Sequence, residues 1–202
     1  MKKNLFLIGY SGHAFVCLDA ALSNNFFKIV GYCDFKKKIN NPYNLDYLGS
    51  ENRYKNSDAK AFISVGDNKT RKLIFKKNFN KFKFDKIFHS KSIISNNCSI
   101  ETGTLVCANA CINPLAEIGK FCIINTGAIV EHECSIGDFV HIGPSAVVCG
   151  NVKIGENTLI GANSVIKPGI VIGSNCIIGS GSVVIQNVSN NSKLVGNPAK
   201  II

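Results

Sequence analysis

The chain has 202 residues, a formal net charge of +10 and nine cysteines. Its basic charge comes without a helix-turn-helix, a zinc finger or an aromatic stacking motif, so nucleic-acid binding is disfavoured, and a solvated surface or an attraction for small anionic molecules remains. No apolar stretch has the length of a membrane span or of a signal peptide. The cysteines form no C-x-x-C pair, so a zinc knuckle or a thioredoxin-type site is not expected. Free cysteines in this number, largely at small positions that are expected to be buried, favour a reducing cytoplasm.

The N-terminal part of the chain predicts a small α/β unit. Residues 4–8 are expected to form a buried strand, residues 9–13 a glycine-rich turn, residues 14 to about 24 a helix, and residues 29–33 and 61–65 two further strands. A strand, a glycine-rich turn, a helix and a strand with an acidic end form the pattern of a Rossmann-like βαβ unit. Residues 1–88 are therefore predicted to form one Rossmann-like domain.

Ser11, Gly12 and His13 lie in the turn before the predicted helix. The turn matches the fingerprint G-x-G-x-x-G incompletely, because Gly9 and Gly12 are three residues apart and Phe15 occupies a later position. Backbone N–H groups at the start of a helix still suit a diphosphate. The alternatives are a substrate-binding turn and a plain turn, and we favour the first.

Polar residues also follow the second and third predicted strands. Asp34 could accept hydrogen bonds from a nucleobase or a ribose, or it could only cap a loop. Gly66 and Asn68 lie after the third strand, on the rim at which such sheets bind ligands. We include all three among the candidate substrate-binding residues.

From residue 94 onward, the chain repeats every six residues. Sixteen consecutive positions at this spacing are aliphatic, namely Ile94, Ile100, Val106, Ile112, Ile118, Ile124, Val130, Ile136, Ile142, Val148, Ile154, Ile160, Ile166, Ile172, Ile178 and Val184. Glycine often follows this anchor, and a small residue usually stands four positions after it. A period of six fits neither an amphipathic helix nor an ordinary strand and is typical of a parallel β-helix. Residues 89–202 are predicted to form that β-helix.

The repeat resembles that of the hexapeptide-repeat acyltransferases, whose β-helix is left-handed and takes three hexads, or 18 residues, per coil. The sixteen hexads would then form about five coils. On this geometry His132 and His141 lie on different sides of one prism, so they could share a site only across an interface between subunits. Gly150 follows His132 by one coil, so its N–H could stabilise a thioester oxyanion beside that imidazole. Glu131 and Glu133 flank His132, and one of them could orient the imidazole and raise its basicity.

The whole chain is similar to the PglD/NeuD-type family of bacterial sugar acetyltransferases. The resemblance is carried by the Gly-x-Ser-Gly-His turn, by Asn-Thr-x-x-x-x-Glu-His-Glu-Cys at residues 125–134, by Gly-Asn-Val-x-Ile-Gly at residues 150–155 and by the terminal Gly-Asn-Pro-Ala-Lys. It implies a nucleotide-sugar-binding α/β domain followed by an acetyl-CoA-binding left-handed β-helix, assembled as a cytoplasmic homotrimer. The implied reaction is N-acetylation of a 4-amino-4,6-dideoxy sugar linked to a nucleotide, with UDP favoured over dTDP or GDP.

The resemblance also implies residue roles. His132 would be the general base, assisted by Glu133 and by the Gly150 amide. The acetyl-CoA thioester would contact His141, and the pantetheine arm would run along the backbone of Ala162 and Ser180. The nucleotide sugar would be held by Ser11, Gly12, His13, Asp34, Gly66 and Asn68.

One departure and three alternatives remain open, of which one is a purely structural or ice-binding solenoid that would need neither an α/β domain nor a His-Glu pair. Cys33 stands where the UDP-sugar enzymes tend to have an aspartate before Asp34, which bears on the identity of the nucleotide. O-acetylation of a sialic acid or a related sugar by the same base is the runner-up. A β-helical carbonic anhydrase is a remote alternative, because it needs three zinc-binding histidines across a trimer interface and only His132 and His141 lie in the repeat.

Overall fold

The computed structural model describes residues 2–55 and 58–202, and it begins with a three-stranded parallel sheet of order β2-β1-β3. The strands are β1 (Lys3–Ile8), β2 (Phe27–Cys33) and β3 (Lys60–Ile63), and the helices are α1 (Gly12–Leu22) and α2 (Asn68–Asn78). The three strands predicted from the sequence are confirmed to within two residues. The first helix begins at Gly12, two residues before the predicted start, because Ser11 is still extended and serves as its N-cap.

Helix α2 was not predicted from the sequence. It contains four lysines, which were interpreted as a solvated surface or as an attraction for small anionic molecules. Its start is nevertheless marked by Asp67, whose Oδ1 accepts a hydrogen bond from the backbone N–H of Thr70 at 2.8 Å. This is the usual contact of an N-cap side chain, and it defines the first turn of the helix.

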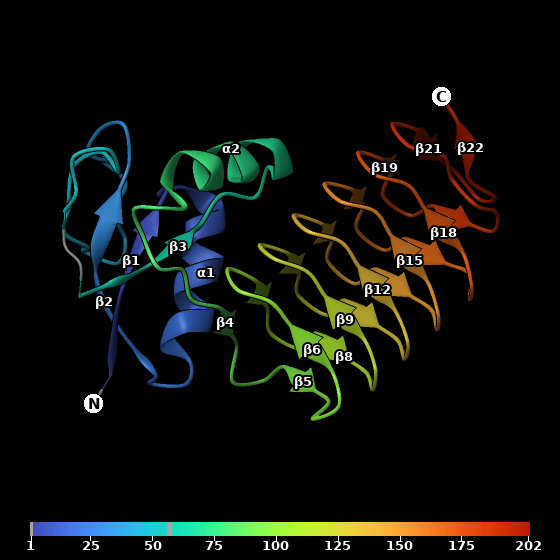
Figure 1. Ribbon diagram of the computed structural model, residues 1–202, viewed down its shortest axis with the longest axis horizontal. Coiled ribbons are helices and arrows are strands. Elements are labelled where there is room, and N and C mark those ends of the chain that lie inside the picture. The colour runs from blue at the N-terminus through green and yellow to red at the C-terminus, as the bar shows by residue number, and fades with distance from the viewer. Residues whose placement is uncertain (1, 56–57) are drawn as a thin grey trace.

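The rest of the chain forms a parallel β-solenoid with three faces (Figure 1). Face 1 carries β4 (Ile87–Phe88), β7 (Leu105–Val106), β10 (Ile123–Ile124), β13 (His141–Ile142), β16 (Leu159–Ile160), β19 (Ile177–Ile178), β21 (Lys193–Val195) and the antiparallel β22 (Lys200–Ile201). Face 2 carries β5 (Ile93–Ile94), β8 (Cys111–Ile112), β11 (Ile129–Val130), β14 (Val147–Val148), β17 (Val165–Ile166) and β20 (Val183–Val184). Face 3 carries β6 (Ser99–Ile100), β9 (Glu117–Ile118), β12 (Ser135–Ile136), β15 (Lys153–Ile154) and β18 (Val171–Ile172).

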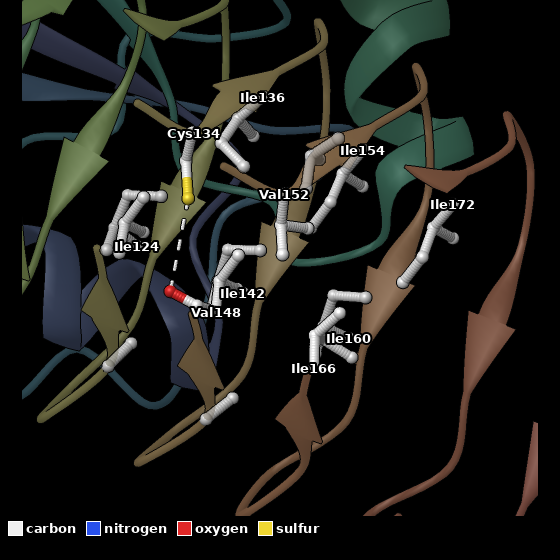
Figure 2. Packing of buried hydrophobic residues seen from close by; sticks show 14 of the residues in the cluster. Ile124, Cys134, Ile136, Ile142, Val148, Val152, Ile154, Ile160, Ile166 and Ile172 are labelled. Carbon is white, nitrogen blue, oxygen red and sulfur yellow. Dashed lines mark hydrogen bonds between the residues drawn. The ribbon is translucent and has the colours of Figure 1, made fainter. Parts of the chain in front are cut away.

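The aliphatic anchors point inward and stack in one column, as Figure 2 shows for residues of several coils. Ile124 pairs with Ile142, and Ile142 pairs with Ile160, so each anchor lies beside the anchor 18 residues later. Small side chains such as Cys134 fill the spaces between anchors, and its thiol approaches the carbonyl oxygen of Val148 at 4.0 Å. Burial of each such aliphatic side chain stabilises the fold by roughly 1.5–3 kcal/mol. The parallel β-helix predicted from the period of six is confirmed.

The solenoid has about six coils rather than the expected five. Its first strand, β4, precedes the aliphatic series because Phe88, an aromatic residue, occupies the anchor position there. The last coil is two residues shorter than the others, since Ile172 bridges to Val188 and Ile177 pairs with Lys193. Both ends of the solenoid therefore depart from the spacing of six between aliphatic residues.

Helix α1 packs against the Leu5 and Leu7 side of the small sheet and α2 against the Phe6 and Ile8 side, so the helices cover opposite faces of that sheet. Helix α1 shares a buried apolar cluster with Ile87, Leu105 and Ile123 of face 1. Helix α2 contributes Phe75, whose ring centroid lies 4.5 Å from that of Phe121 at a corner of the solenoid. The α/β unit is therefore docked on face 1. Both described helices have 11 residues, and neither is long and apolar enough to cross a membrane.

Candidate active site

His132 and Glu133 lie at the corner between face 2 and face 3, in the turn from β11 to β12. The Nδ1 atom of His132 is 3.0 Å from Oε2 of Glu133, and both side chains are 58% exposed. A carboxylate only accepts hydrogen bonds, so Nδ1 carries a proton, and in the neutral imidazole Nε2 presents its lone pair. Glu133 has a φ of 61°, so the corner itself turns its side chain back toward the histidine. The pair has the arrangement of an oriented general base.

Gly150 lies against the imidazole of His132, one coil further along the solenoid. A Cβ atom on Gly150 would be 2.7 Å from Nε2 and 2.6 Å from Cε1, so only glycine leaves room for the ring in this position. The backbone N–H of Asn151 donates to the carbonyl of His132 at 2.9 Å and fixes the two turns to each other. The N–H of Gly150 donates to no acceptor within the described residues. It is thus available to a ligand beside Nε2.

A second group of predicted residues gathers where the α/β unit meets face 1. His141 stands on β13, and its Nε2 is 3.0 Å from Nδ2 of Asn125 on the preceding coil. The His13 ring, from the first turn of α1, has its centroid 6.3 Å from that of His141. Gly66 lies beside both histidines: a Cβ atom on it would be 3.5 Å from Cγ of His13, and its backbone bonds to His141. Residues from both parts of the chain thus form one cluster.

Both histidines of this cluster are neutral near pH 7. Burial lowers the pKa of His13 from 6.5 to about 4, and the positive charge of Arg71 adds to the lowering. Burial likewise lowers the pKa of His141 to about 4, with contributions from Arg71 and from His13. A neutral His141 can offer either a donor or an acceptor to a ligand without bringing a charge into the site.

These lowered pKa values predict that acid destabilises the protein. Between pH 6.5 and about 4 the unfolded chain binds protons at His13 and His141 that the folded chain does not bind, so the free energy of unfolding falls as the pH falls. Each unit of lowering corresponds to about 1.4 kcal/mol. Urea unfolding at pH 7, 6 and 5 should show this loss, and the double variant His13→Asn, His141→Asn should lose less over the same interval. Equal slopes in the two proteins would disprove the assignment.

Arg71 joins the α/β unit to the solenoid. It is 1% exposed, and its guanidinium donates to the carbonyl oxygens of Phe121 (2.8 Å) and Phe139 (3.0 Å) on the solenoid. It also donates to the carbonyl oxygens of Val65 (3.1 Å) and Gly66 (2.9 Å). Burial lowers the pKa of Arg71 to about 10, so the group remains charged at neutral pH. No sequence pattern indicated this role, because an arginine in a lysine-rich segment is usually solvated.

Asn68 takes part in the same junction. Its Oδ1 accepts from Arg71 at 2.8 Å, and its Nδ2 donates to the carbonyl of Thr158 on the solenoid at 3.1 Å. With Gly66 it also lines a groove of about 610 Å³ between the start of α2 and face 1, and His141 lies in the wall of that groove. The groove is closed on the solenoid side by Leu159, Ile177, Lys193 and the corner asparagines Asn157, Asn175 and Asn191.

Ser11 and Asp34 line a different cavity, which we call the α/β pocket. It has a volume of about 370 Å³, and it lies at the carboxyl ends of β1 and β2, with one wall formed by α2. Ser11 is the N-cap of α1 but makes no side-chain capping bond, and the helix begins with Gly12. The start of α1 therefore offers free N–H groups for an anionic ligand.

The carboxylate of Asp34 is already engaged within the protein. Its Oδ2 accepts from the backbone N–H of Tyr10 and pairs with Nζ of Lys38, each at 3.0 Å. Its Oδ1 accepts from the backbone N–H of Phe35 at 2.7 Å. Asp34 thus holds the glycine turn and Lys38 in place at the pocket.

One chain does not bring all the candidate residues together. His132 lies at the corner between faces 2 and 3, whereas His141 lies on face 1. Ala162 and Ser180 lie at the corner between faces 1 and 2, in consecutive coils, where the N–H of Gly181 donates to the carbonyl of Ala162 at 2.8 Å. Within residues 2–55 and 58–202, no group of three or more His, Cys, Asp or Glu side chains could hold a metal ion.

Two family models match the chain. The model of the PglD N-terminal domain matches residues 4–78, and the model of the bacterial transferase hexapeptide, with six repeats, matches residues 151–186. These matches fall on the α/β unit and on the solenoid, respectively.

Solved structures match the chain over nearly its full length. The acetyltransferase domain of PglB from Neisseria gonorrhoeae is 27% identical, with a TM-score of 0.93 and 100% of both chains covered, and it has also been solved in complex with acetyl coenzyme A. PerB from Caulobacter crescentus, in complex with CoA and GDP-perosamine, is 28% identical with a TM-score of 0.92 and covers 98% of this chain and 97% of its own. WeeI from Acinetobacter baumannii is 25% identical, with a TM-score of 0.87 and 100% of both chains covered.

Proposed function

On the premise that this chain belongs to the PglD-type family of hexapeptide-repeat sugar acetyltransferases, we propose that it N-acetylates a nucleotide-linked 4-amino-4,6-dideoxy sugar with acetyl-CoA. The observation that carries this proposal is the His132–Glu133 pair with the free amide of Gly150 beside Nε2. A general base next to a hydrogen-bond donor is what amine attack on a thioester requires.

The reaction follows from that geometry. The amine nitrogen attacks the thioester carbonyl carbon, a C–N bond forms, and the carbonyl oxygen becomes an oxyanion that the N–H of Gly150 can stabilise. Nε2 of His132 accepts the proton that the nitrogen loses, and the charge of Glu133 stabilises the resulting imidazolium. The C–S bond then breaks, and the CoA sulfur leaves with a proton from the imidazolium. No covalent bond to the enzyme is needed.

Three features support the choice of substrates. PglB and PerB have been solved with acetyl-CoA, or with CoA and GDP-perosamine, a nucleotide-linked amino sugar. In this chain the α/β pocket offers the start of α1 to a diphosphate, with Lys38 nearby. All nine cysteines are free, which suits the reducing cytoplasm in which acetyl-CoA is available.

The proposed enzyme acts as a homotrimer. His132 and His141 lie on different sides of one solenoid, and Ala162 and Ser180 lie at a third location. A neighbouring chain would complete the site, with His141, Ala162 and Ser180 placing acetyl-CoA between two solenoids. The other candidates, namely Ser11, Gly12, His13, Asp34, Gly66 and Asn68, would place the sugar nucleotide. Light scattering that gives the mass of one fully active chain would contradict this assembly.

A substrate panel tests the function. The purified protein is mixed with acetyl-CoA and UDP-, dTDP- or GDP-linked 4-amino-4,6-dideoxy sugars, and the release of free thiol is followed. CMP-sialic acid and free sialic acid serve as acceptors for O-acetylation. We expect thiol release with a nucleotide-linked amino sugar and an N-acetylated product in mass spectrometry. Turnover with a sialic acid alone, or with none of the acceptors, would contradict the proposal.

A further inference from the structure

Glu51 lies in the wall of the α/β pocket, and its carboxylate has no partner among the described residues. The residue is 8% exposed and lines the pocket beside Cys33 and Asp34. Within the described residues its carboxylate forms no hydrogen bond and no ion pair. Among the described residues, the enclosed side-chain oxygens that accept no hydrogen bond belong to Asn78, Asp85 and Asn157, and the carboxylate oxygens of Glu51 are not among them. The Glu51 carboxylate therefore opens into the pocket.

Lys81 and Lys38, two lysines near Glu51, contact groups other than its carboxylate. Nζ of Lys81 donates to the backbone carbonyl of Glu51 and lies 4.9 Å from the ring centroid of Phe82, so its direct contacts are with the backbone and a ring. Asp34, the other acid in the pocket wall, is occupied by two backbone N–H groups and by Lys38. Glu51 is thus the carboxylate in this wall that remains free to accept hydrogen bonds from a ligand.

The position of Glu51 indicates which part of a nucleotide it would meet. The start of α1 at Ser11 is the place for a diphosphate. Glu51 follows Gly49, whose carbonyl accepts from the backbone N–H of Asp34 at 3.2 Å, so it lies beside the carboxyl end of β2. In Rossmann-like folds the nucleoside extends from the phosphate site toward that end of the second strand. Leu73 and Ile74 of α2 add an apolar wall for a flat ring.

We propose that Glu51 binds the nucleobase and selects guanine, so that the acceptor is a GDP-linked amino sugar. This inference rests on the proposed function. Guanine presents N1–H and the N2 amino group side by side, and the two oxygens of a carboxylate accept both. Uracil and thymine present a single N–H between two carbonyl oxygens. A carboxylate can accept from that N–H, but its second oxygen is then repelled by a carbonyl oxygen of the base. Adenine and cytosine place an acceptor nitrogen beside their amino group. The preference for UDP drawn from the resemblance is therefore replaced by one for GDP.

Nucleotide binding to the unmodified protein gives the first test. Titration calorimetry with GDP, IDP, UDP and dTDP needs neither acetyl-CoA nor a sugar, so its result is independent of the transfer reaction. GDP should bind roughly 10- to 100-fold more tightly than UDP or dTDP, since a bidentate contact discriminates strongly between bases. IDP lacks the N2 amino group and should fall between. Equal or tighter binding of UDP or dTDP, or no binding of any of the four, would overturn the proposal.

The variant Glu51→Gln gives the second test, with Glu101→Gln on the solenoid surface as the matched control. Glutamine replaces one acceptor by a donor, so the variant should lose about tenfold or more in GDP affinity and should no longer distinguish GDP from IDP. Its UDP affinity and its melting temperature should stay close to those of the control.

A uniform loss of affinity for all four nucleotides would show that Glu51 only shapes the pocket. If the guanine preference is found but no amino sugar is acetylated, the proposed function fails and the base assignment stands.

Discussion

Replacing His132 by alanine is expected to lower kcat by roughly 10²–10⁴-fold, the usual contribution of a positioned general base. The side chain is more than half exposed and lies outside the aliphatic column, so its removal leaves no cavity. The free energy of unfolding, the oligomeric state and the affinity for acetyl-CoA should therefore stay unchanged. Steady-state kinetics on the acceptor identified by the panel, together with a thermal melt, provide the measurement.

A second variant tests the same site through its neighbour. Gly150→Ala would place a methyl group 2.7 Å from Nε2 of His132, and the ring would have to move. It should lower kcat while His132 is still present, and the limb of the pH–rate profile that reports the base should shift or weaken. In His132→Ala that limb should disappear. Near-normal turnover of His132→Ala would mean that another group accepts the proton, even though the fold is as described.

Replacing Arg71 by methionine is expected to destabilise the protein by about 3–5 kcal/mol, because buried carbonyl oxygens would lose their donor. These oxygens belong to Phe121, Phe139, Val65 and Gly66. Methionine fills much of the space, so the loss reflects hydrogen bonds more than packing. Urea unfolding compares the two proteins, with Arg53→Met as the matched control, since Arg53 is exposed.

Hydrogen exchange distinguishes the local effect of losing Arg71 from a general loss of stability. Arg71 connects the α/β unit with two successive turns at one corner of the solenoid, so hydrogen exchange should increase first in α2 and in the segment that contains Gly66. The aliphatic column should keep its protection. A change in stability of less than about 1 kcal/mol would show that water replaces the guanidinium at these oxygens.

The sequence alone was sufficient for the solenoid, because its structure is set by a local period. Ile124, Ile142 and Ile160 are anchors in the sequence and neighbours on face 1. The same spacing of 18 residues brings Gly150 to His132. The ends of the solenoid were less predictable, since Phe88 departs from the aliphatic pattern and the last coil is two residues shorter.

Only the tertiary structure showed which polar side chains of the α/β unit form contacts and which remain free once that unit is docked on face 1. The approach of His13 to His141, the five-bond network of Arg71 and the free carboxylate of Glu51 depend on contacts between residues without any repeating spacing. In the sequence Arg71 and Glu51 resemble surface charges, because burial of a charge depends on segments that are distant along the chain. The periodic sequence thus determined the solenoid and the proximity of His132 to Gly150. The packing of the α/β unit on the solenoid determined which polar groups form bonds within the protein and which remain free to bind a ligand.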